Sequence, residues 1–265
     1  MITLAAASLS FDGFEDADFA ATFDLAPRIG FRALELNCWY PRNLSAAGVR
    51  SIRRRCDENG LQPVSLHFTE IGGENPNELS KSLTYGMRGI DMAAELGCTT
   101  FVTLGAPRGK AGGIEAIVAT LEHLVPYAEE VGITIGLENH DGHIIQTLDD
   151  YATILDRLDS NRLGVCADIG HFHASGIAND EIIDRFGDRV VHIHVKDNAS
   201  FGTKRFVPFG DGTADNEGFV RSMADRGYDG AVVVELSPNS LDFSNRDAHV
   251  GALTTAYQMF APFAG

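Results

Sequence analysis

The sequence lacks the features that mark several classes of protein. It contains no run of about 18 apolar residues, so we expect no transmembrane helix. Its N-terminus, MITLAAASLSFDGFEDADF, is apolar and then acidic, without the basic region that opens a signal peptide. No GxGxxG motif follows the first apolar run, which weighs against a dinucleotide-binding sheet. No Pro- or Ser-rich linker divides the chain, so we expect one domain over residues 1–265.

Cysteine and positive charge are also scarce. The four cysteines form no CxxC pair; they are Cys38, Cys56, Cys98 and Cys166. This favours buried thiols in a reducing compartment, and we expect a cytoplasmic protein. The net charge of −16 would repel a nucleic acid, and the arginines near residue 53 lie on a predicted helix face. We therefore expect neither a nucleic acid nor a membrane as partner.

Short apolar runs alternate with helix-like segments along the whole chain. Hydrophobic residues make up 44% of it, enough for one large core. The expected strands lie near residues 2–7, 32–37, 62–67, 99–104, 133–138, 163–168, 190–195 and 231–236. The expected helices cover 16–28, 45–59, 78–96, 114–131, 147–158, 179–186, 216–226 and 245–261. Eight such pairs in 265 residues predict an α/β fold, a single (β/α)8 TIM barrel.

Four of the predicted strands carry a possible metal ligand at or near their C-terminal ends. These are Glu138 in ITIGLEN, Asp168 in RLGVCAD, His194 in VVHIHVKD and Glu235 in AVVVEL. A βαβ unit takes roughly 30 residues, so the spacing places each on a different strand at the same end. Barrel enzymes keep their active sites at that end. Three carboxylates and one imidazole suit Mn²⁺, Mg²⁺ or Co²⁺, and can take Zn²⁺.

Each of these residues also has a structural interpretation. Glu138 could form a salt bridge or cap a helix, and Asp168 could cap a short turn. In VVHIHVKD, a period of two places His192 and His194 on the same side of the strand, inside the barrel. His192 lies deeper, which favours a hydrogen-bonded histidine in the barrel floor, whereas His194 is nearer the mouth and favours the ligand role.

Five motifs give the chain a resemblance to a known family. They are GLEN at 136–139, ADIGH at 167–171, HIHVKD at 192–197, PFGDG at 208–212 and GYDGAVVVEL at 227–236. With them the chain resembles the xylose isomerase-like barrel superfamily, in the group of sugar phosphate isomerases and epimerases. The resemblance implies a divalent metal held by Glu138, Asp168, His194 and Glu235. Among the possible cations, we expect Mn²⁺.

The resemblance also implies a reaction. We expect an isomerase or epimerase that acts on a sugar or keto-polyol through an enediolate, with Glu138 and Glu235 as both ligands and bases. The candidate substrate-binding residues are His171, Lys196, His67, His140 and Arg205. Glu35 and Trp39 are further candidates for the mouth of the barrel. Phe209 lies with Arg205 on a long loop that we expect to cover the substrate.

Other reactions on the same scaffold stay open. A lyase, such as an inosose or dehydroshikimate dehydratase or a deglycosidase, would expel a leaving group from the same enolate. Related ketose 3-epimerases carry a Glu six residues after the first ligand, where this chain has Ile144. An AP endonuclease would need further histidines; His67 is available, but the fourth strand has none. A non-catalytic sugar-binding subunit is a further alternative, and a homo-oligomer is possible.

Overall fold

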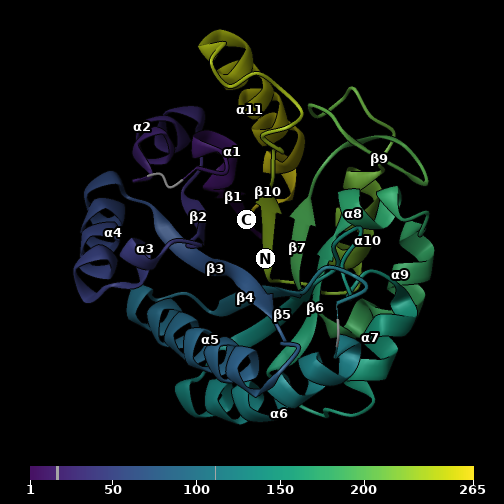
Figure 1. Ribbon diagram of the computed structural model, residues 1–265. Helices are drawn as coiled ribbons and strands as arrows, with labels where there is room; N and C mark the ends of the chain where they lie inside the picture. Colours follow the sequence, from purple (N-terminus) through teal and green to yellow (C-terminus); the bar gives the residue numbers. More distant parts are fainter. Residues whose placement is uncertain (16–17, 111) are drawn as a thin grey trace.

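The computed structural model describes residues 1–15, 18–110 and 112–265, and its centre is a closed barrel of eight parallel strands (Figure 1). The barrel strands are β1 (Thr3–Ala7), β2 (Ala33–Asn37), β3 (Gln62–Ile71), β4 (Thr100–Gly105), β5 (Thr134–Glu138), β6 (Leu163–Asp168), β7 (Val190–Val195) and β10 (Ala231–Val234). The barrel closes because β1 pairs with both β2 and β10. The predicted (β/α)8 fold is confirmed.

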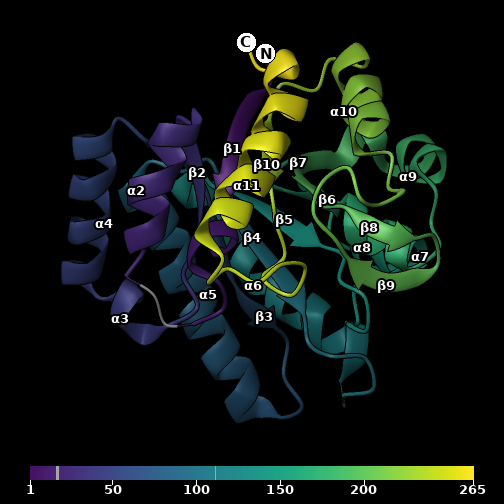
Figure 2. The same ribbon diagram turned by 90° about the horizontal axis from the view of Figure 1, so that it is seen from above.

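Helices surround the barrel, one or more after each strand (Figures 1 and 2). They are α1 (Leu9–Asp12), α2 (Ala20–Ile29), α3 (Pro41–Leu44), α4 (Ala46–Asn59), α5 (Pro76–Leu96), α6 (Gly113–Val131), α7 (Leu148–Leu155), α8 (Ile169–Ala174), α9 (Asn179–Phe186), α10 (Asn216–Asp225) and α11 (Arg246–Phe260). The start of the helix expected at 16–28 lies partly outside the described residues. In the part of the chain that is described, no helix is long and apolar enough to span a membrane.

Local sequence sets several helix ends where we expected them. The Ser45 hydroxyl accepts a hydrogen bond from the amide of Gly48 and begins α4. Helices α4, α5 and α6 end at Gly60, Gly97 and Gly132, whose φ angles of 61°, 82° and 84° lie in the left-handed region. Glycine adopts this conformation without the steric cost of a Cβ atom, so each helix turns directly into the next strand.

The barrel has apolar surroundings but a partly polar interior. Along β1, Leu4 and Ala6 face the helices, whereas Ala5 and Ala7 belong to a small inner cluster, as the period of two requires. Fully buried polar side chains from other strands also lie inside; they are Glu35, Ser65, His192 and His194. All four cysteines are buried and free, as predicted.

The segment after β7 forms a structure that the sequence did not predict. It is an antiparallel hairpin of β8 (Asn198–Ser200) and β9 (Thr203–Phe206), which lies beside α8 (Figure 2). Phe209 follows the hairpin but is buried against Phe260, with ring centroids 5.6 Å apart. Phe209 itself therefore does not reach the substrate cavity, although Lys204 and Phe206 of the same loop line it. Asp197 accepts hydrogen bonds from the amides of Gly210 and Gly212, so the GDG sequence forms a turn.

Candidate active site

The four side chains at the strand ends meet at one point. Their candidate ligand atoms all lie within 4.8 Å of one another, and all four residues are buried; they are Glu138, Asp168, His194 and Glu235. Strands β5, β6, β7 and β10 are consecutive neighbours in the barrel, so parallel pairing brings the four together. Nδ1 of His194 lies 2.7 Å from Oε1 of Glu138 and 3.3 Å from Oε2 of Glu235.

Asp168 uses its two carboxylate oxygens differently. Oδ1 accepts the amide of His171 and caps α8, so the N-cap interpretation of this residue is correct. Oδ2 is buried and faces the cluster, 3.9 Å from Nδ1 of His194 and 2.9 Å from the ammonium of Lys196. Burial raises the pKa of Asp168 to about 6; the ammonium of Lys196 opposes this rise, and the nearby Glu235 and Glu138 add to it.

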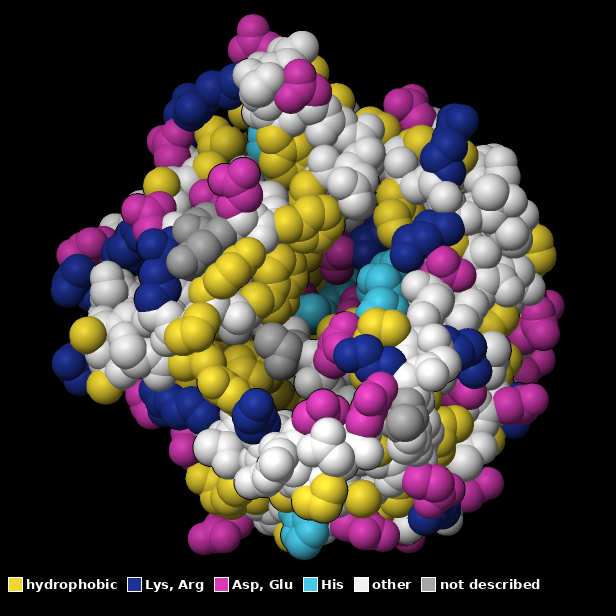
Figure 3. All heavy atoms as spheres, viewed as in Figure 1, with side chains coloured by type: hydrophobic (Ala, Val, Ile, Leu, Met, Phe, Trp, Pro, Cys, Tyr) yellow, Lys and Arg dark blue, Asp and Glu magenta, His cyan; other side chains and the backbone are white. Residues whose placement is uncertain are grey.

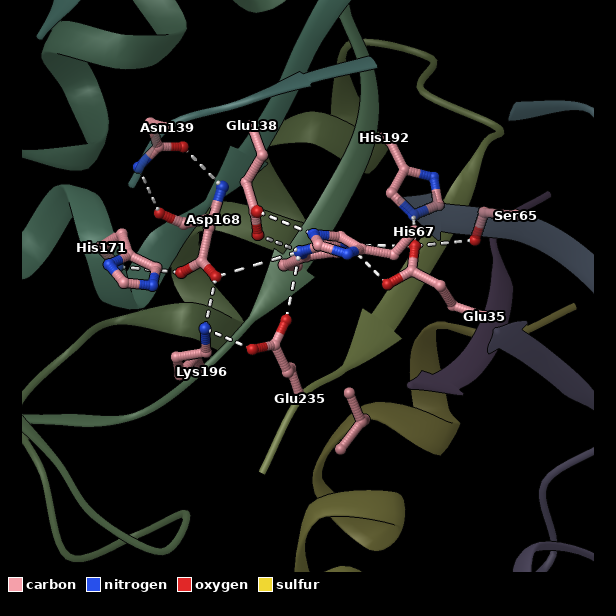
Figure 4. Close-up of polar contacts among 12 residues, drawn as sticks. Glu35, Ser65, His67, Glu138, Asn139, Asp168, His171, His192, Lys196 and Glu235 are labelled. Carbon is pink, nitrogen blue, oxygen red and sulfur yellow. Dashed lines mark hydrogen bonds and ion pairs between the residues drawn. The ribbon is translucent and has the colours of Figure 1, made fainter. Parts of the chain in front are cut away.

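Asn139 fixes the relative position of two of these strand ends. Its side-chain oxygen accepts the amide of Asp168 at 2.9 Å, and its side-chain amide donates to the carbonyl of Asp168 at 3.0 Å. The pair of bonds ties the end of β5 to the end of β6 (Figure 4). Asn139 lies in the GLEN motif, but nothing in the motif predicts this positioning contact.

Lys196 is the positive charge nearest to the cluster. Its ammonium lies 2.9 Å from Oδ2 of Asp168 and 2.5 Å from Oε1 of Glu235, with all three side chains buried (Figure 4). Burial alone would lower the pKa of Lys196, but the two carboxylates hold it above its ordinary value. Lys196 therefore stays charged and leaves part of the carboxylate charge uncompensated.

His67 connects the cluster to Trp39. The indole Nε1 of Trp39 donates to Nδ1 of His67 at 3.1 Å, so the imidazole proton lies on Nε2. That nitrogen is 3.0 Å from Oε2 of Glu138. Burial would raise the pKa of Glu138, but His67 and His194 hold it well below its usual value, which keeps the carboxylate ionised.

Two further histidines lie side by side at the cavity wall. The rings of His140 and His171 are in contact, with centroids 3.9 Å apart and an interplanar angle of 35°. Nδ1 of His171 accepts the amide of Asp141, which leaves the proton on Nε2 as a donor. Nδ1 of His140 donates to the carbonyl of Asp141, which makes its Nε2 an acceptor. Burial lowers the pKa of His140 to about 3 and that of His171 well below its usual value, so both rings are neutral.

Glu35 lies on the opposite side of His194 from the other carboxylates. Nε2 of His192 and Nε2 of His194 lie 2.9 Å and 3.1 Å from its Oε2, and Ser65 donates to the same oxygen (Figure 4). Glu35 is fully buried, so the expectation that it lines the mouth is wrong. The preferred interpretation of His192 as a buried, hydrogen-bonded histidine is confirmed.

A cavity of about 480 Å³ opens above the cluster. Figure 3 shows it as a hollow with histidine and acidic side chains at its base and apolar side chains along one rim. The lining residues are Leu9, Phe14, Trp39, His67, Phe68, Glu70, Leu104, Glu138, His140, His171, Lys196, Lys204, Phe206, Glu235, Ser237 and Asn239. Of the four clustered residues, Glu138 and Glu235 line the cavity, whereas Asp168 and His194 lie beneath it.

The structure does not place Arg205 in the cavity. Side chains along a strand alternate between two faces, and β9 directs Lys204 and Phe206 to the cavity. Arg205 lies between them and is exposed, away from the lining. The sequence placed the correct segment near the mouth but named the wrong residue. The other candidates for substrate binding, His67, His140, His171 and Lys196, all line the cavity.

The donor set fits a divalent cation. Three carboxylates surround Nδ1 of His194, and the single ammonium of Lys196 is paired with two of them, Asp168 and Glu235. Uncompensated buried carboxylate oxygens are costly unless a cation neutralises them. The fold and this cluster define a parallel β/α barrel with a carboxylate and imidazole site at the C-terminal ends of its strands.

The chain belongs to the family described as xylose isomerase-like TIM barrel, which it matches over residues 23–252. It is 29% identical over 238 residues to an inosose dehydratase of Clostridium perfringens, covering 78% of each chain. It is 23% identical over 240 residues to a D-psicose 3-epimerase of Enterocloster bolteae, covering 83% of this chain and 77% of that one. The solved structure of an IOLI protein with a bound zinc atom superposes with a TM-score of 0.80 at 18% identity, covering 98% of this chain and 97% of the other.

Proposed function

We propose that this protein is a divalent-metal-dependent enzyme that isomerises or epimerises a sugar or keto-polyol through an enediolate. The observation that supports it best is that two of the four possible metal ligands also line the substrate cavity. All four residues can contribute to holding a cation, but only Glu138 and Glu235 also reach the cavity. A metal-ligating group and a base are thus available in the same two side chains. We propose Mn²⁺ as the cation.

Glu138, Asp168, His194 and Glu235 would hold the cation, which when bound would supply electrostatic stabilisation of negative charge on substrate oxygens. Glu138 is the base that we assign to removal of the proton next to the carbonyl, because it is ionised and oriented by His67. Glu235 is the second carboxylate at the cavity and would return the proton. Lys196, 2.5 Å from Glu235, would hold this second carboxylate in place.

The neutral histidines are suited to a polyol. His171 offers a donor and His140 an acceptor on adjacent rings, so together they match the two roles of a sugar hydroxyl. Trp39 and Phe206 supply flat apolar surfaces of the kind that pack against a sugar ring. Lys204 at the mouth lies 3.6 Å from a carboxylate oxygen of Asp141. A small neutral sugar derivative therefore fits the cavity better than a polyanion.

The test combines metal analysis with isotope exchange. Purified protein loaded with Mn²⁺ or Co²⁺ should hold the metal stoichiometrically. Incubation with keto-sugars, inososes and 3-keto-glycosides in D₂O should place deuterium next to the carbonyl of the true substrate, as seen by NMR. Glu138→Gln and Glu235→Gln should each abolish this exchange, whereas Glu70→Gln, in a half-exposed residue of the same cavity, should retain it. If exchange persists in both Glu138→Gln and Glu235→Gln, neither carboxylate is the base.

A lyase is the second candidate, and the similarity to an inosose dehydratase at 29% identity favours it. Ile144, the position at which we looked for a further epimerase carboxylate, is buried and lies outside the lining of this cavity. Mass analysis of the product separates the two candidates. Retention of mass identifies isomerisation or epimerisation, and loss of water or of an aglycone identifies a lyase.

A further inference from the structure

Inside the barrel, Glu35 makes a set of contacts that the proposed reaction does not use. Its Oε2 accepts from the hydroxyl of Ser65 at 2.9 Å and lies 2.9 Å from Nε2 of His192 and 3.1 Å from Nε2 of His194. The four residues come from three strands, with β2 and β3 on one side of the barrel and β7 on the other. Glu35 and both histidines are fully buried, so bulk water does not compete for these contacts.

These contacts determine where the imidazole protons lie. An ionised carboxylate only accepts hydrogen bonds, so each Nε2 that faces Glu35 must carry a hydrogen. His194 then directs its other nitrogen, Nδ1, at Glu138, Asp168 and Glu235. With Nε2 engaged by Glu35, Nδ1 is the nitrogen available to a cation. Metal-ligating histidines are usually oriented by a carboxylate on the second ring nitrogen.

We propose that Glu35 is a positioning residue that holds the hydrogen of His194 on Nε2 and thereby presents Nδ1 to the metal centre. His192 is a companion of Glu35 in this arrangement, because it fills the space beside the carboxylate and donates to the same oxygen. The inference rests on the proposed metal centre, but the contact between Glu35 and His194 can be tested without a metal.

A second cation between Glu35, His192 and His194 is the competing interpretation, since their ligand atoms also cluster. Three features oppose it. The site offers three protein ligands, Ser65 already donates to the carboxylate oxygen, and every member is buried without access to the cavity. One carboxylate with three hydrogen-bond donors accounts for the geometry without a metal.

The first test uses the unaltered protein and imidazole ¹⁵N NMR, with the His194 signals assigned by substitution. We expect an Nε2–H resonance of His194 that is protected from solvent in the metal-free protein and persists after loading with diamagnetic Zn²⁺, when Nδ1 changes shift. Ligation through Nε2, or two zinc ions per chain, would overturn the proposal. If no zinc binds, the proposed metal centre is refuted. The Nε2–H resonance of His194 in the metal-free protein still tests whether Glu35 accepts a hydrogen bond from that nitrogen.

The second test changes the contact itself. In Glu35→Gln, the side chain keeps its shape but loses its negative charge, and a donating amide replaces one of the two carboxylate oxygens, each of which lies 3.1 Å from Nε2 of His194. We expect Zn²⁺ affinity to fall about 10- to 100-fold, as for other carboxylates that orient a metal-binding histidine. Ser65→Ala removes only the bond that involves no imidazole and should leave the affinity close to that of the unaltered protein. Equal Zn²⁺ affinity in Glu35→Gln and Ser65→Ala would refute the positioning role of Glu35. If Glu35→Gln does not fold, the NMR experiment on the unaltered protein tests that role.

Discussion

At the scale of single residues, the candidate site depends on side chains that each make two contacts. Asp168 caps α8 with one oxygen and faces the cluster with the other. Glu138 contacts His67 with one oxygen and His194 with the other. Each residue is thereby fixed in orientation before any ligand arrives, which is the condition for precise placement of reacting groups.

Lys196 provides a prediction at this scale. Lys196→Met keeps the apolar stem but removes the buried ammonium between Asp168 and Glu235. Leaving a buried charge without its partner costs about 3–5 kcal/mol. We expect a loss of this size in the free energy of unfolding, measured in denaturant with a chelator present. Added Mn²⁺ should reduce the loss, because a cation can replace part of the missing charge.

Lys204→Met is the matched control for this prediction. Lys204 is partly exposed at the mouth and lies 3.6 Å from a carboxylate oxygen of Asp141, so its ion pair should contribute less than about 1 kcal/mol. Equal losses in the two variants would mean that burial does not govern the contribution of Lys196.

His249 provides a second prediction, away from the site. Its Nε2 donates to the carbonyl of Ser10 at 2.7 Å, and its ring stacks on Phe243. Burial lowers the pKa of His249, and the bond to Ser10 only partly opposes this. The unfolded chain therefore binds the proton more readily, so stability is lost as the pH falls below about 6.5.

We expect His249→Gln, which can still donate to Ser10, to gain stability relative to the unaltered protein as the pH falls from about 7.5 to about 5.5. Chemical unfolding at several pH values measures the difference. His123→Gln, at an exposed position on α6, controls for the loss of one histidine. A difference that does not vary with pH would contradict the assignment to His249.

At the scale of elements, the sequence predicted the regular β/α units and missed the short irregular ones. Periodic apolar runs and C-terminal glycines identify β2, α4 and β5 because each of these signals is local. Hairpin β8–β9 has no such signal. It is held by Asn198, whose side chain donates to the carbonyls of Ser200 and Thr203 and accepts the amide of Arg205. Contacts of one side chain with surrounding backbone leave no period in the sequence.

The hairpin provides a prediction at this scale. Asn198→Ala removes three hydrogen bonds that shape it, and Lys204 and Phe206 of β9 line the cavity. We expect faster amide hydrogen exchange in residues 198–206, a higher apparent KM for the exchange reaction and an unchanged metal affinity. Thr203→Ala, an exposed position in the same hairpin, is the control. A lower metal affinity in Asn198→Ala would show that the hairpin supports the cluster as well as the cavity wall.

At the scale of the whole molecule, closure of the barrel decides which residues meet. The four clustered residues lie on consecutive strands, and a parallel barrel brings such strand ends together whatever the details of packing. The sequence therefore predicted this group. Glu35, which accepts a hydrogen bond from Ser65, reaches His192 and His194 from the opposite wall, across the interior. Such a contact depends on the inner diameter and the register of β2, which shifts against β3 at Glu35, and no spacing in the chain encodes it.

A metal that binds side chains from four strands should stabilise the barrel as a unit. A ligand that binds only the folded state, at a free concentration 100 times its Kd, adds about 2.7 kcal/mol. For a chain of this size that corresponds to a rise in Tm of about 5–10 °C. Calorimetry of chelator-treated protein, titrated with Mn²⁺, measures the shift. Glu138→Gln should lose most of it, because the cation loses a ligand charge, whereas Glu70→Gln should retain it. A shift of equal size in both variants would mean that the stabilising cation binds elsewhere on this strongly acidic chain, whose net charge is −16.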